Sequence, residues 1–338
     1  MIYLLLIFSF ALIFSLALMP IAERLGHKTG IINAPSSDRL SKKAIPLLGG
    51  AAIYISFFLA LLIFGKQFRI HQLIGIIVGA TIISFFGLYD DWREISASFK
   101  FFGQVIPVVI LIATGIKVEI FRNDILNIFV TMLWVIGITN SINLLDNMDG
   151  IAGGVSAISS LFFFVLSTLN GQYLVASLSA AIVGVCLGFL KYNLNPARIF
   201  MGDTGALFLG FILSVLGIKL RFPRIPYIYT WMIPIVILAY PIMDTTLVTI
   251  SRLRRGVNPF TTPGTDHSTH RLCLLGLSHK QVALSVYCLS AFFGILSIAI
   301  FNFPGVVGYS IFFATLLIIA VMIFYFEWIY SKNNRLKS

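Results

Sequence analysis

The sequence predicts an all-α polytopic membrane protein, and three observations support this fold class. The chain of 338 residues is 58% hydrophobic and only 11% charged, which leaves too few charges to cover a soluble domain of this size. Its apolar residues gather in runs of about 17 to 25, the length that spans a bilayer. The longest polar stretches, 23–45 and 251–281, contain no soluble domain. We therefore expect one integral membrane domain over residues 1–338.

Taken in order, the apolar runs predict about eleven transmembrane helices. The first run lacks the basic segment of a cleavable signal, and we interpret it as a retained span. The runs lie near residues 2–22, 46–65, 71–88, 100–116, 125–142, 152–169, 172–190, 204–220, 228–249, 283–301 and 304–328.

The charges in the loops predict the orientation. Most of the 24 lysines and arginines fall after odd-numbered helices or in the C-terminal tail. The positive-inside rule then places the N-terminus outside and the C-terminus in the cytoplasm. Among the acids, only Glu119 and Asp124 fall in an outer loop. This asymmetry indicates an active site on the cytoplasmic face, built from several helix ends.

The first acidic motif, Gly87-Leu88-Tyr89-Asp90-Asp91, closes the third expected span. Adjacent carboxylates at a membrane edge are costly, because desolvation and like charge both oppose ionisation. A divalent cation with phosphate oxygens would offset that cost. Taken alone, the pair is also what a solvated helix end would carry.

The second motif is a polar stripe at the end of the fifth expected span. Asn140, Asn143, Asp146 and Asp149 recur at every third residue, a spacing that keeps side chains near one face of a helix. Unpaired polar groups rising into a span are expensive, and amides and carboxylates hydrogen-bond well to nucleobases and sugars. The stripe is therefore a candidate binding surface.

The third motif, Met201-Gly202-Asp203-Thr204-Gly205, precedes the eighth expected span. A carboxylate at the edge of a span usually marks a site. An N-cap explains Asp203 equally well when the motif is considered alone.

Together the motifs resemble the polyprenyl-phosphate N-acetylhexosamine-1-phosphate transferase family of membrane enzymes. Each piece is weak, whereas their order and spacing are specific, and the similarity extends over most of the chain. The pieces are Gly49-Gly50, Gly87 to Asp91, Lys100 with Gln104, Asn140 to Gly150, Phe200 to Gly205, Pro241 to Thr245 and Asp266-His267-Ser268-Thr269-His270-Arg271.

The resemblance implies transfer of an N-acetylhexosamine 1-phosphate, with GlcNAc 1-phosphate as the first expectation. The donor is a UDP-N-acetylhexosamine, the acceptor is undecaprenyl phosphate, and UMP is released. Mg²⁺ is the implied cofactor, with Mn²⁺ as a substitute. The implied catalytic residues are Asp90, Asp91 and Asp203. The implied metal ligands are Asp203, Asp91 and Asn143, and the implied substrate-binding residues are Lys100, Asn140, Asn143, Asp146, Asp149, His267, His270 and Arg271.

The same resemblance implies further properties of the whole protein. It would lie in the bacterial inner or plasma membrane and begin the synthesis of a cell-envelope glycan, such as teichoic acid or lipopolysaccharide. Homodimers occur in the family, so a homodimer is a candidate assembly. The basic residues are scattered over short loops, which disfavours nucleic acid as a partner.

Some positions depart from the family pattern. Thr269 and Ser41 stand where relatives often carry histidine, and Asn33 stands at a usual aspartate position. The phospho-N-acetylmuramoyl-pentapeptide transferase branch is the main enzymatic alternative, although it usually keeps three consecutive histidines. A membrane transporter and an inactive, scaffold-like relative also remain open.

Overall fold

The computed structural model describes residues 1–33, 44–64, 70–93, 95–223, 225–258 and 264–335. The departure at Ser41 lies outside the described residues. The elements are α1 (Ile2–Thr29), β1 (Ile32–Asn33), β2 (Ile45–Pro46), α2 (Gly49–Phe64), α3 (Ile70–Trp92), α4 (Ala97–Ala113), α5 (Asp124–Leu145), α6 (Ile151–Leu169), α7 (Tyr173–Asn193), α8 (Gly202–Lys219), α9 (Tyr229–Ile237), α10 (Ala239–Arg254), α11 (Ser268–Leu274), α12 (His279–Asn302) and α13 (Val306–Arg335).

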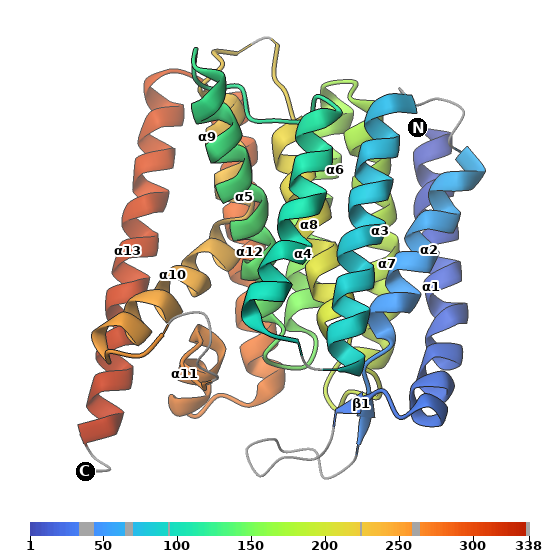
Figure 1. Ribbon diagram of the computed structural model, residues 1–338. Coiled ribbons are helices and arrows are strands. Elements are labelled where there is room, and N and C mark those ends of the chain that lie inside the picture. The colour runs from blue at the N-terminus through green and yellow to red at the C-terminus, as the bar shows by residue number, and fades with distance from the viewer. Residues whose placement is uncertain (34–43, 65–69, 94, 224, 259–263, 336–338) are drawn as a thin grey trace.

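The long helices form one bundle, with the two ends of the chain at opposite ends of it (Figure 1). Within the described residues, eight helices have the length and hydropathy of a membrane span, or nine if α9 and α10 count as one. Helices α2 and α4 are apolar but shorter. The chain is thus an all-α polytopic membrane protein, while the expected count of eleven spans and the orientation stay predictions.

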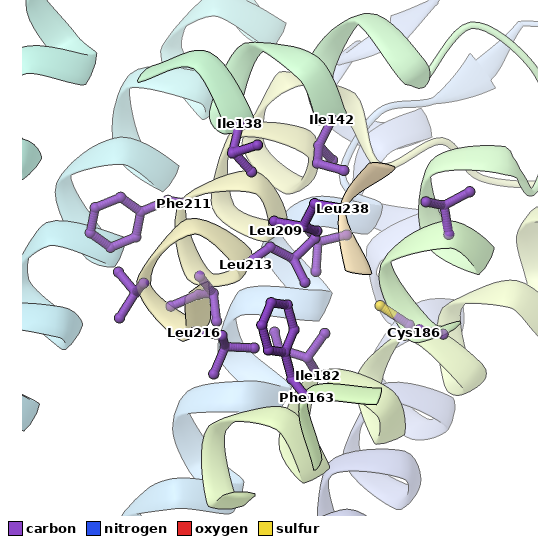
Figure 2. Close-up of a cluster of buried hydrophobic side chains, with 14 of the residues drawn as sticks. Ile138, Ile142, Phe163, Ile182, Cys186, Leu209, Phe211, Leu213, Leu216 and Leu238 are labelled. Carbon is purple, nitrogen blue, oxygen red and sulfur yellow. The ribbon is translucent and has the colours of Figure 1, made fainter. Parts of the chain in front are cut away.

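Helix α8 forms the centre of the bundle. It packs against α2, α3, α5, α6, α7 and α9, and 89% of its most apolar stretch is buried. Figure 2 shows Leu209, Leu213 and Leu216 of α8 meeting side chains of neighbouring helices, among them Ile138 of α5 and Phe163 of α6. Because every face of α8 is covered by protein, its N-terminus is held in a defined place at the end of the bundle.

The ninth expected span is broken. Its two halves, α9 and α10, meet at an angle of 71°. Pro241 has no N–H to donate to the carbonyl of Ile237, and its ring crowds that carbonyl. The hydroxyl of Ser159 on α6 donates to the Ile237 oxygen instead, at 3.4 Å. Helix α10 therefore leaves the bundle direction and crosses towards α13 (Figure 1).

Two small elements that the apolar runs did not predict lie at the same end as α11. Strands β1 and β2 pair antiparallel, with Ile32 opposite Pro46. Beyond β2, the N–H of Gly50 donates to the carbonyl of Met201 at 2.9 Å. A side chain on Gly50 would overlap the backbone of Gly205, so the Gly49-Gly50 motif brings the start of α2 directly against the start of α8.

Candidate active site

The third, fourth, fifth and eighth helices bring their polar ends together. Helices α3 and α5 end, and α4 and α8 begin, at the end of the bundle where α11 and the β1–β2 hairpin lie (Figure 1). Helix α8 contacts α3 and α5, and α4 contacts the same two helices. Side chains that are far apart in the sequence therefore meet at one end of the bundle.

Lys100 joins two carboxylates from different helices. Its Nζ lies 2.6 Å from Oδ2 of Asp90 on α3 and forms a second ion pair with Oδ2 of Asp203 on α8. The N–H of Ile95 donates to the other oxygen of Asp90 at 3.0 Å. All three ionic side chains are only partly exposed. Two carboxylate oxygens thus converge on one cationic position.

Asp91 is the cap of α8, although it belongs to α3. Its Oδ1 accepts the N–H of Asp203 at 2.8 Å, and its Oδ2 accepts the N–H of Thr204 at 3.0 Å. The Thr204 hydroxyl adds a third hydrogen bond at 2.6 Å. These contacts satisfy N–H groups that every helix start leaves unpaired, and they place negative charge at the positive end of the helix dipole.

The local backbone depends on Gly202. Its φ is +61°, and a Cβ at this position would lie 2.5 Å from Oδ2 of Asp91. Glycine is therefore needed both for the backbone conformation and for the approach of the carboxylate. Asp203 itself lies in the first turn of α8 and is not the N-cap, which is Met201. The alternative interpretation, in which Asp203 is the N-cap of α8, is therefore wrong.

The polar stripe divides among three different partners. Asn143 donates from Nδ2 to Oδ1 of Asp203 at 2.8 Å. Asn140 pairs instead with Gln104 of α4, in two amide contacts of 2.6 and 3.1 Å. Asp149 accepts the Asn195 amide and an N–H of the α7–α8 loop. Helix α5 ends at Leu145, so the every-third-residue spacing no longer keeps Asp149 on the same helical face.

Asp146 follows the last residue of α5. It occupies the C-cap position, and its N–H donates to the carbonyl of Asn143 at 3.2 Å. Of the predicted site residues, the structure therefore brings together Asp90, Asp91, Lys100, Asn143 and Asp203. Asn140 and Asp149 hold neighbouring segments in place.

A second polar group surrounds Asp244, which is 1% exposed on α10. Its Oδ2 lies 2.8 Å from Nδ1 of His267. Its Oδ1 accepts the N–H of Ser268 at 2.8 Å and the Ser268 hydroxyl at 2.5 Å. Tyr240 shares a further hydrogen bond with that hydroxyl at 2.9 Å. The bend after α9 brings Asp244 to this position, where it fixes the start of α11.

The histidine segment also touches the turn after α5. Thr269 donates from Oγ1 to Oδ1 of Asn147 at 2.7 Å. The next residue, His270, is largely buried, and its Nδ1 has no hydrogen-bond partner among the described residues. Burial and the neighbouring His267 lower the pKa of His270 to about 4, so the imidazole is neutral near pH 7. The departure from histidine at Thr269 thus creates a specific contact with Asn147.

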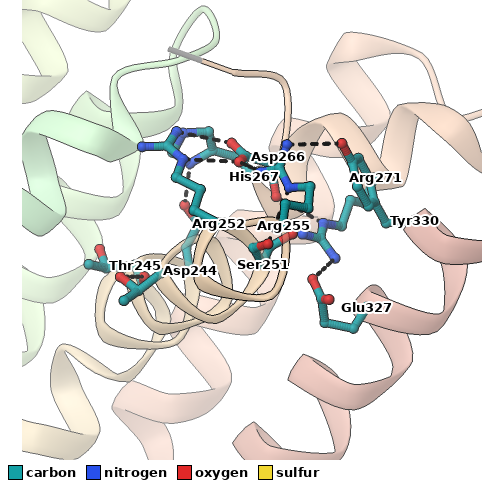
Figure 3. A network of polar contacts seen from close by, with 11 residues as sticks. Asp244, Thr245, Ser251, Arg252, Arg255, Asp266, His267, Arg271, Glu327 and Tyr330 are labelled. Carbon is teal, nitrogen blue, oxygen red and sulfur yellow. Dashed lines mark hydrogen bonds and ion pairs between the residues drawn. The ribbon is translucent and has the colours of Figure 1, made fainter. Parts of the chain in front are cut away.

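Arg271, predicted to bind substrate, has no exposed surface. Its Nε donates to the carbonyl of Asp266 at 2.8 Å, and its Nη1 donates to Oε1 of Glu327 at 2.7 Å. Figure 3 shows these contacts beside the pairing of Asp266 with Arg252 and Arg255. Burial opposes ionisation of Asp266, but the hydrogen bonds and charge of Arg252 hold its pKa below the usual range.

Several residues that sequence reasoning did not assign to the site support it. Asp244 had a signal, because an acid inside an apolar run usually marks function. Glu327 had a weaker signal of the same kind than Asp244, because it stands near the end of the last apolar run. Among their polar partners, Gln104, Asn147, Thr204 and Ser268 fall within the motifs that carry the family resemblance, whereas Asn195 and Tyr240 had no comparable signal.

The residues around Lys100 fit a hard divalent cation. The described part of the chain holds no group of three or more His, Cys, Asp or Glu side chains arranged as a metal site. Mg²⁺ commonly takes only one or two protein carboxylates and fills its other positions with phosphate and water. Asp90 and Asp203, whose oxygens already converge on one cation, match that requirement, and Asn143 lies beside Asp203. Asp91, the remaining implied metal ligand, instead uses both of its oxygens to accept hydrogen bonds from the start of α8.

The sequence is similar to those of known membrane transferases. Residues 73–221 match the model of glycosyl transferase family 4. A probable undecaprenyl-phosphate N-acetylglucosaminyl 1-phosphate transferase of Bacillus subtilis is 35% identical over 94% of this chain and 89% of its own length. A decaprenyl-phosphate N-acetylglucosaminephosphotransferase of Mycolicibacterium smegmatis is 26% identical over 78% and 73%.

A relative from the muramoyl branch is similar over a shorter part. The phospho-N-acetylmuramoyl-pentapeptide-transferase of Streptococcus uberis is 31% identical over 54% of this chain and 62% of its own length. The similarity to the Bacillus subtilis protein extends over nearly the whole of both chains, and the matched family region includes Asp90, Asp91, Lys100, Asn143 and Asp203. This chain therefore belongs to glycosyl transferase family 4.

Proposed function

We propose that this chain transfers N-acetylglucosamine 1-phosphate from a UDP-sugar to a polyprenyl phosphate, with undecaprenyl phosphate as the first candidate, and releases UMP. The observation that carries the proposal is the meeting of Asp90, Lys100 and Asp203 at one end of a membrane bundle. Such a site can hold an anionic diphosphate against a cation while the lipid chain of the acceptor stays in the bilayer.

The reaction is a displacement at phosphorus. An oxygen of the lipid phosphate attacks the phosphorus that bears the sugar, and the bond from that phosphorus to the bridging oxygen of UMP breaks. The bridging oxygen leaves with UMP, and a lipid diphosphate sugar forms. The attacking phosphate is already an oxyanion near pH 7. No protein nucleophile is required, so we favour direct attack over an aspartyl-phosphate intermediate.

The residues of this chain supply position and charge. Lys100 offers its ammonium to phosphate oxygens once the donor is bound, and Asn143 orients the carboxylate of Asp203 by its hydrogen bond. Asp91 keeps the start of α8 in place. Asp90 and Asp203 are the residues that would hold Mg²⁺, which when bound neutralises charge on the diphosphate.

The direct test is release of UMP. Purified protein, Mg²⁺ and undecaprenyl phosphate are incubated with UDP-GlcNAc, UDP-GalNAc or UDP-MurNAc-pentapeptide in separate reactions. We expect UMP with UDP-GlcNAc, and no UMP after EDTA until Mg²⁺ is restored. The absence of UMP with every donor, where the Bacillus subtilis relative turns over, would refute the proposal.

One variant and one labelling experiment sharpen this test. Asp203→Asn should lower turnover at least ~100-fold because it removes a charge from the reacting centre, while the protein still purifies as a folded species. Full activity in Asp203→Asn would remove this residue from the centre. Labelled phosphate on Asp90 after incubation with donor alone would replace direct attack with a covalent mechanism.

The choice of donor distinguishes the proposed activity from that of a phospho-N-acetylmuramoyl-pentapeptide transferase. The resemblance assigns three consecutive histidines to that branch, whereas this chain has Thr269 between Ser268 and His270. Thr269 is committed to Asn147 in the folded protein. UMP release with UDP-MurNAc-pentapeptide in place of UDP-GlcNAc would favour that branch.

The remaining whole-protein properties belong to the same proposal. The site would face the cytoplasm, where UDP-sugars are made, with the N-terminus on the opposite side of the inner or plasma membrane. In the sequence, most lysines and arginines follow odd-numbered expected spans or lie in the C-terminal tail, and this bias supports the orientation. The product would be the lipid-linked first sugar of an envelope glycan.

A further inference from the structure

The last helix, α13, carries one acidic side chain that contacts the histidine segment, which comprises residues 266–271. Only 11% of the most apolar stretch of α13 is buried, yet Glu327 on this helix is 7% exposed. Its Oε1 accepts Arg271 at 2.7 Å, and its Oε2 accepts Arg254 at 2.9 Å. A buried carboxylate is costly unless it is paired in this way, so the pairing fixes how α13 meets α10 and α11.

Arg271 connects the Glu327 carboxylate to the backbone just before α11. Its Nε donates to the carbonyl of Asp266 at 2.8 Å, one residue before His267. The guanidinium lies over the ring of Tyr330, 4.8 Å from the ring centroid. Its Nη2 is buried and has no hydrogen-bond partner among the described residues. With no exposed surface, Arg271 can act on a substrate only through the segment that it holds.

The held segment has a second, separate anchor. The Asp266 carboxylate pairs with Arg252 of α10 at 3.0 Å, and His267 pairs with Asp244 of the same helix at 2.8 Å. These contacts tie the segment to α10. The Glu327–Arg271 pair ties it to α13 as well (Figure 3). Helices α10 and α13 therefore together determine where the first turn of α11, from His267 to His270, lies.

We infer that Glu327 is a positioning residue: through Arg271 it fixes the Asp266 carbonyl, and thereby the placement of the His267–His270 turn against the donor substrate. This inference rests on the proposed transferase function. The last helix of the bundle then does more than anchor the chain in lipid, because its end sets the geometry of a binding segment that begins sixty residues earlier.

The kinetic test uses Glu327→Gln, which keeps the shape of the side chain and removes its charge. We expect kcat/KM for UDP-GlcNAc to fall on the order of tenfold or more, counted per folded molecule. Glu23→Gln is the matched control. Glu23 pairs with Arg198 at the same end of the bundle, but this pair is more exposed and does not touch the histidine segment. The control should keep wild-type kinetics.

A thiol test reports on the segment without turnover. Cys273 lies on α11 and is partly buried, whereas Cys186 and Cys288 lie on α7 and α12 and are replaced by alanine. Burial raises the pKa of the Cys273 thiol, which slows its alkylation because the thiolate reacts. Maleimide should label Cys273 several-fold faster in Glu327→Gln than in the parent protein or in Glu23→Gln.

The outcomes separate the positioning role from a purely structural one. A lower melting temperature with unchanged kcat, KM and Cys273 labelling would overturn the inference. If Glu327→Gln does not fold, Tyr330→Leu removes the ring over Arg271, together with the contacts of Tyr330 with Arg255, and should shift both measurements in the same direction by a smaller factor. No shift in Tyr330→Leu would then overturn it.

Failure of the proposed function gives a different result. A parent protein that releases no UMP with any donor would refute the transferase proposal, and the kinetic arm would be lost with it. The labelling arm would still decide whether Glu327 determines the position of α11.

Discussion

The carboxylate of Asp91 on α3 holds Thr204 on α8 by two hydrogen bonds, one from the backbone N–H at 3.0 Å and one from the hydroxyl at 2.6 Å. A residue at the end of one span therefore caps the start of another. The contact locks together the two helices that carry Asp90 and Asp203, so the separation of these carboxylates depends on Asp91.

This relationship predicts a graded effect of two substitutions. Asp91→Asn cannot accept hydrogen bonds on both atoms, so it should destabilise the protein by about 1–2 kcal/mol and lower turnover strongly. Thr204→Val removes only the hydroxyl and should cost less on both measures. Thermal unfolding and UMP release of the purified variants test the order, and an unchanged Asp91→Asn protein would contradict the capping role.

A second prediction concerns the cation at the centre of the site. Lys100→Met removes the ammonium between Asp90 and Asp203. The two carboxylates should then attract a free divalent cation more strongly, on the order of tenfold, while turnover falls because the donor phosphates lose a partner. Mn²⁺ binding followed by electron paramagnetic resonance measures the first effect and UMP release the second. Weaker Mn²⁺ binding in Lys100→Met would place the metal elsewhere.

A third prediction separates Asn140 from Asn143. Asn140→Ala should lower stability and leave KM for the UDP-sugar unchanged, because its amide is paired with Gln104. Asn143→Ala should lower kcat, because Asp203 loses its hydrogen bond. A double-mutant cycle of Asn140 and Gln104 should give a coupling of about 0.5–1.5 kcal/mol. A raised KM in Asn140→Ala would return this residue to the binding surface.

A fourth prediction follows from His270, whose pKa is lowered to about 4 by burial and by His267. Between the ordinary histidine value of about 6.5 and about 4, the unfolded chain binds more protons at this site than the folded chain does. The free energy of unfolding must therefore decrease as the pH is lowered through this window.

Melting temperature measured against pH tests this sign. His270→Gln should flatten the decrease between about pH 6.5 and pH 4, whereas His27→Gln, at an exposed position of α1, should keep the wild-type slope. Asp266 has its effect at lower pH, because its pKa is depressed in the folded protein. The stability that this carboxylate contributes is present above the pKa of the unfolded chain, and it is lost as the pH falls through the pKa of the folded protein. Equal slopes in all three proteins would contradict the assignment to His270.

Much of the site was predictable because its residues carry local costs. Asp90, Asp203 and Asn143 stand at the edges of apolar runs, where an unpaired polar group is expensive, and the structure joins them around Lys100. The expectation that Asn140, Asn143 and Asp149 form one binding surface was too simple. Their spacing is one sequence pattern, but the end of α5 at Leu145 and the neighbours Gln104 and Asn195 give each a different partner.

The sequence by itself determined that this protein is an all-α membrane bundle with polar helix ends, because hydropathy and the cost of burying charge depend on residue type and order along the chain. Only the tertiary structure decided that Asp91 caps α8, that Pro241 bends the ninth span, and that Glu327 holds Arg271. Each of these depends on which helix lies beside which. That choice is made by the packing of many side chains around α8, and no local pattern records it.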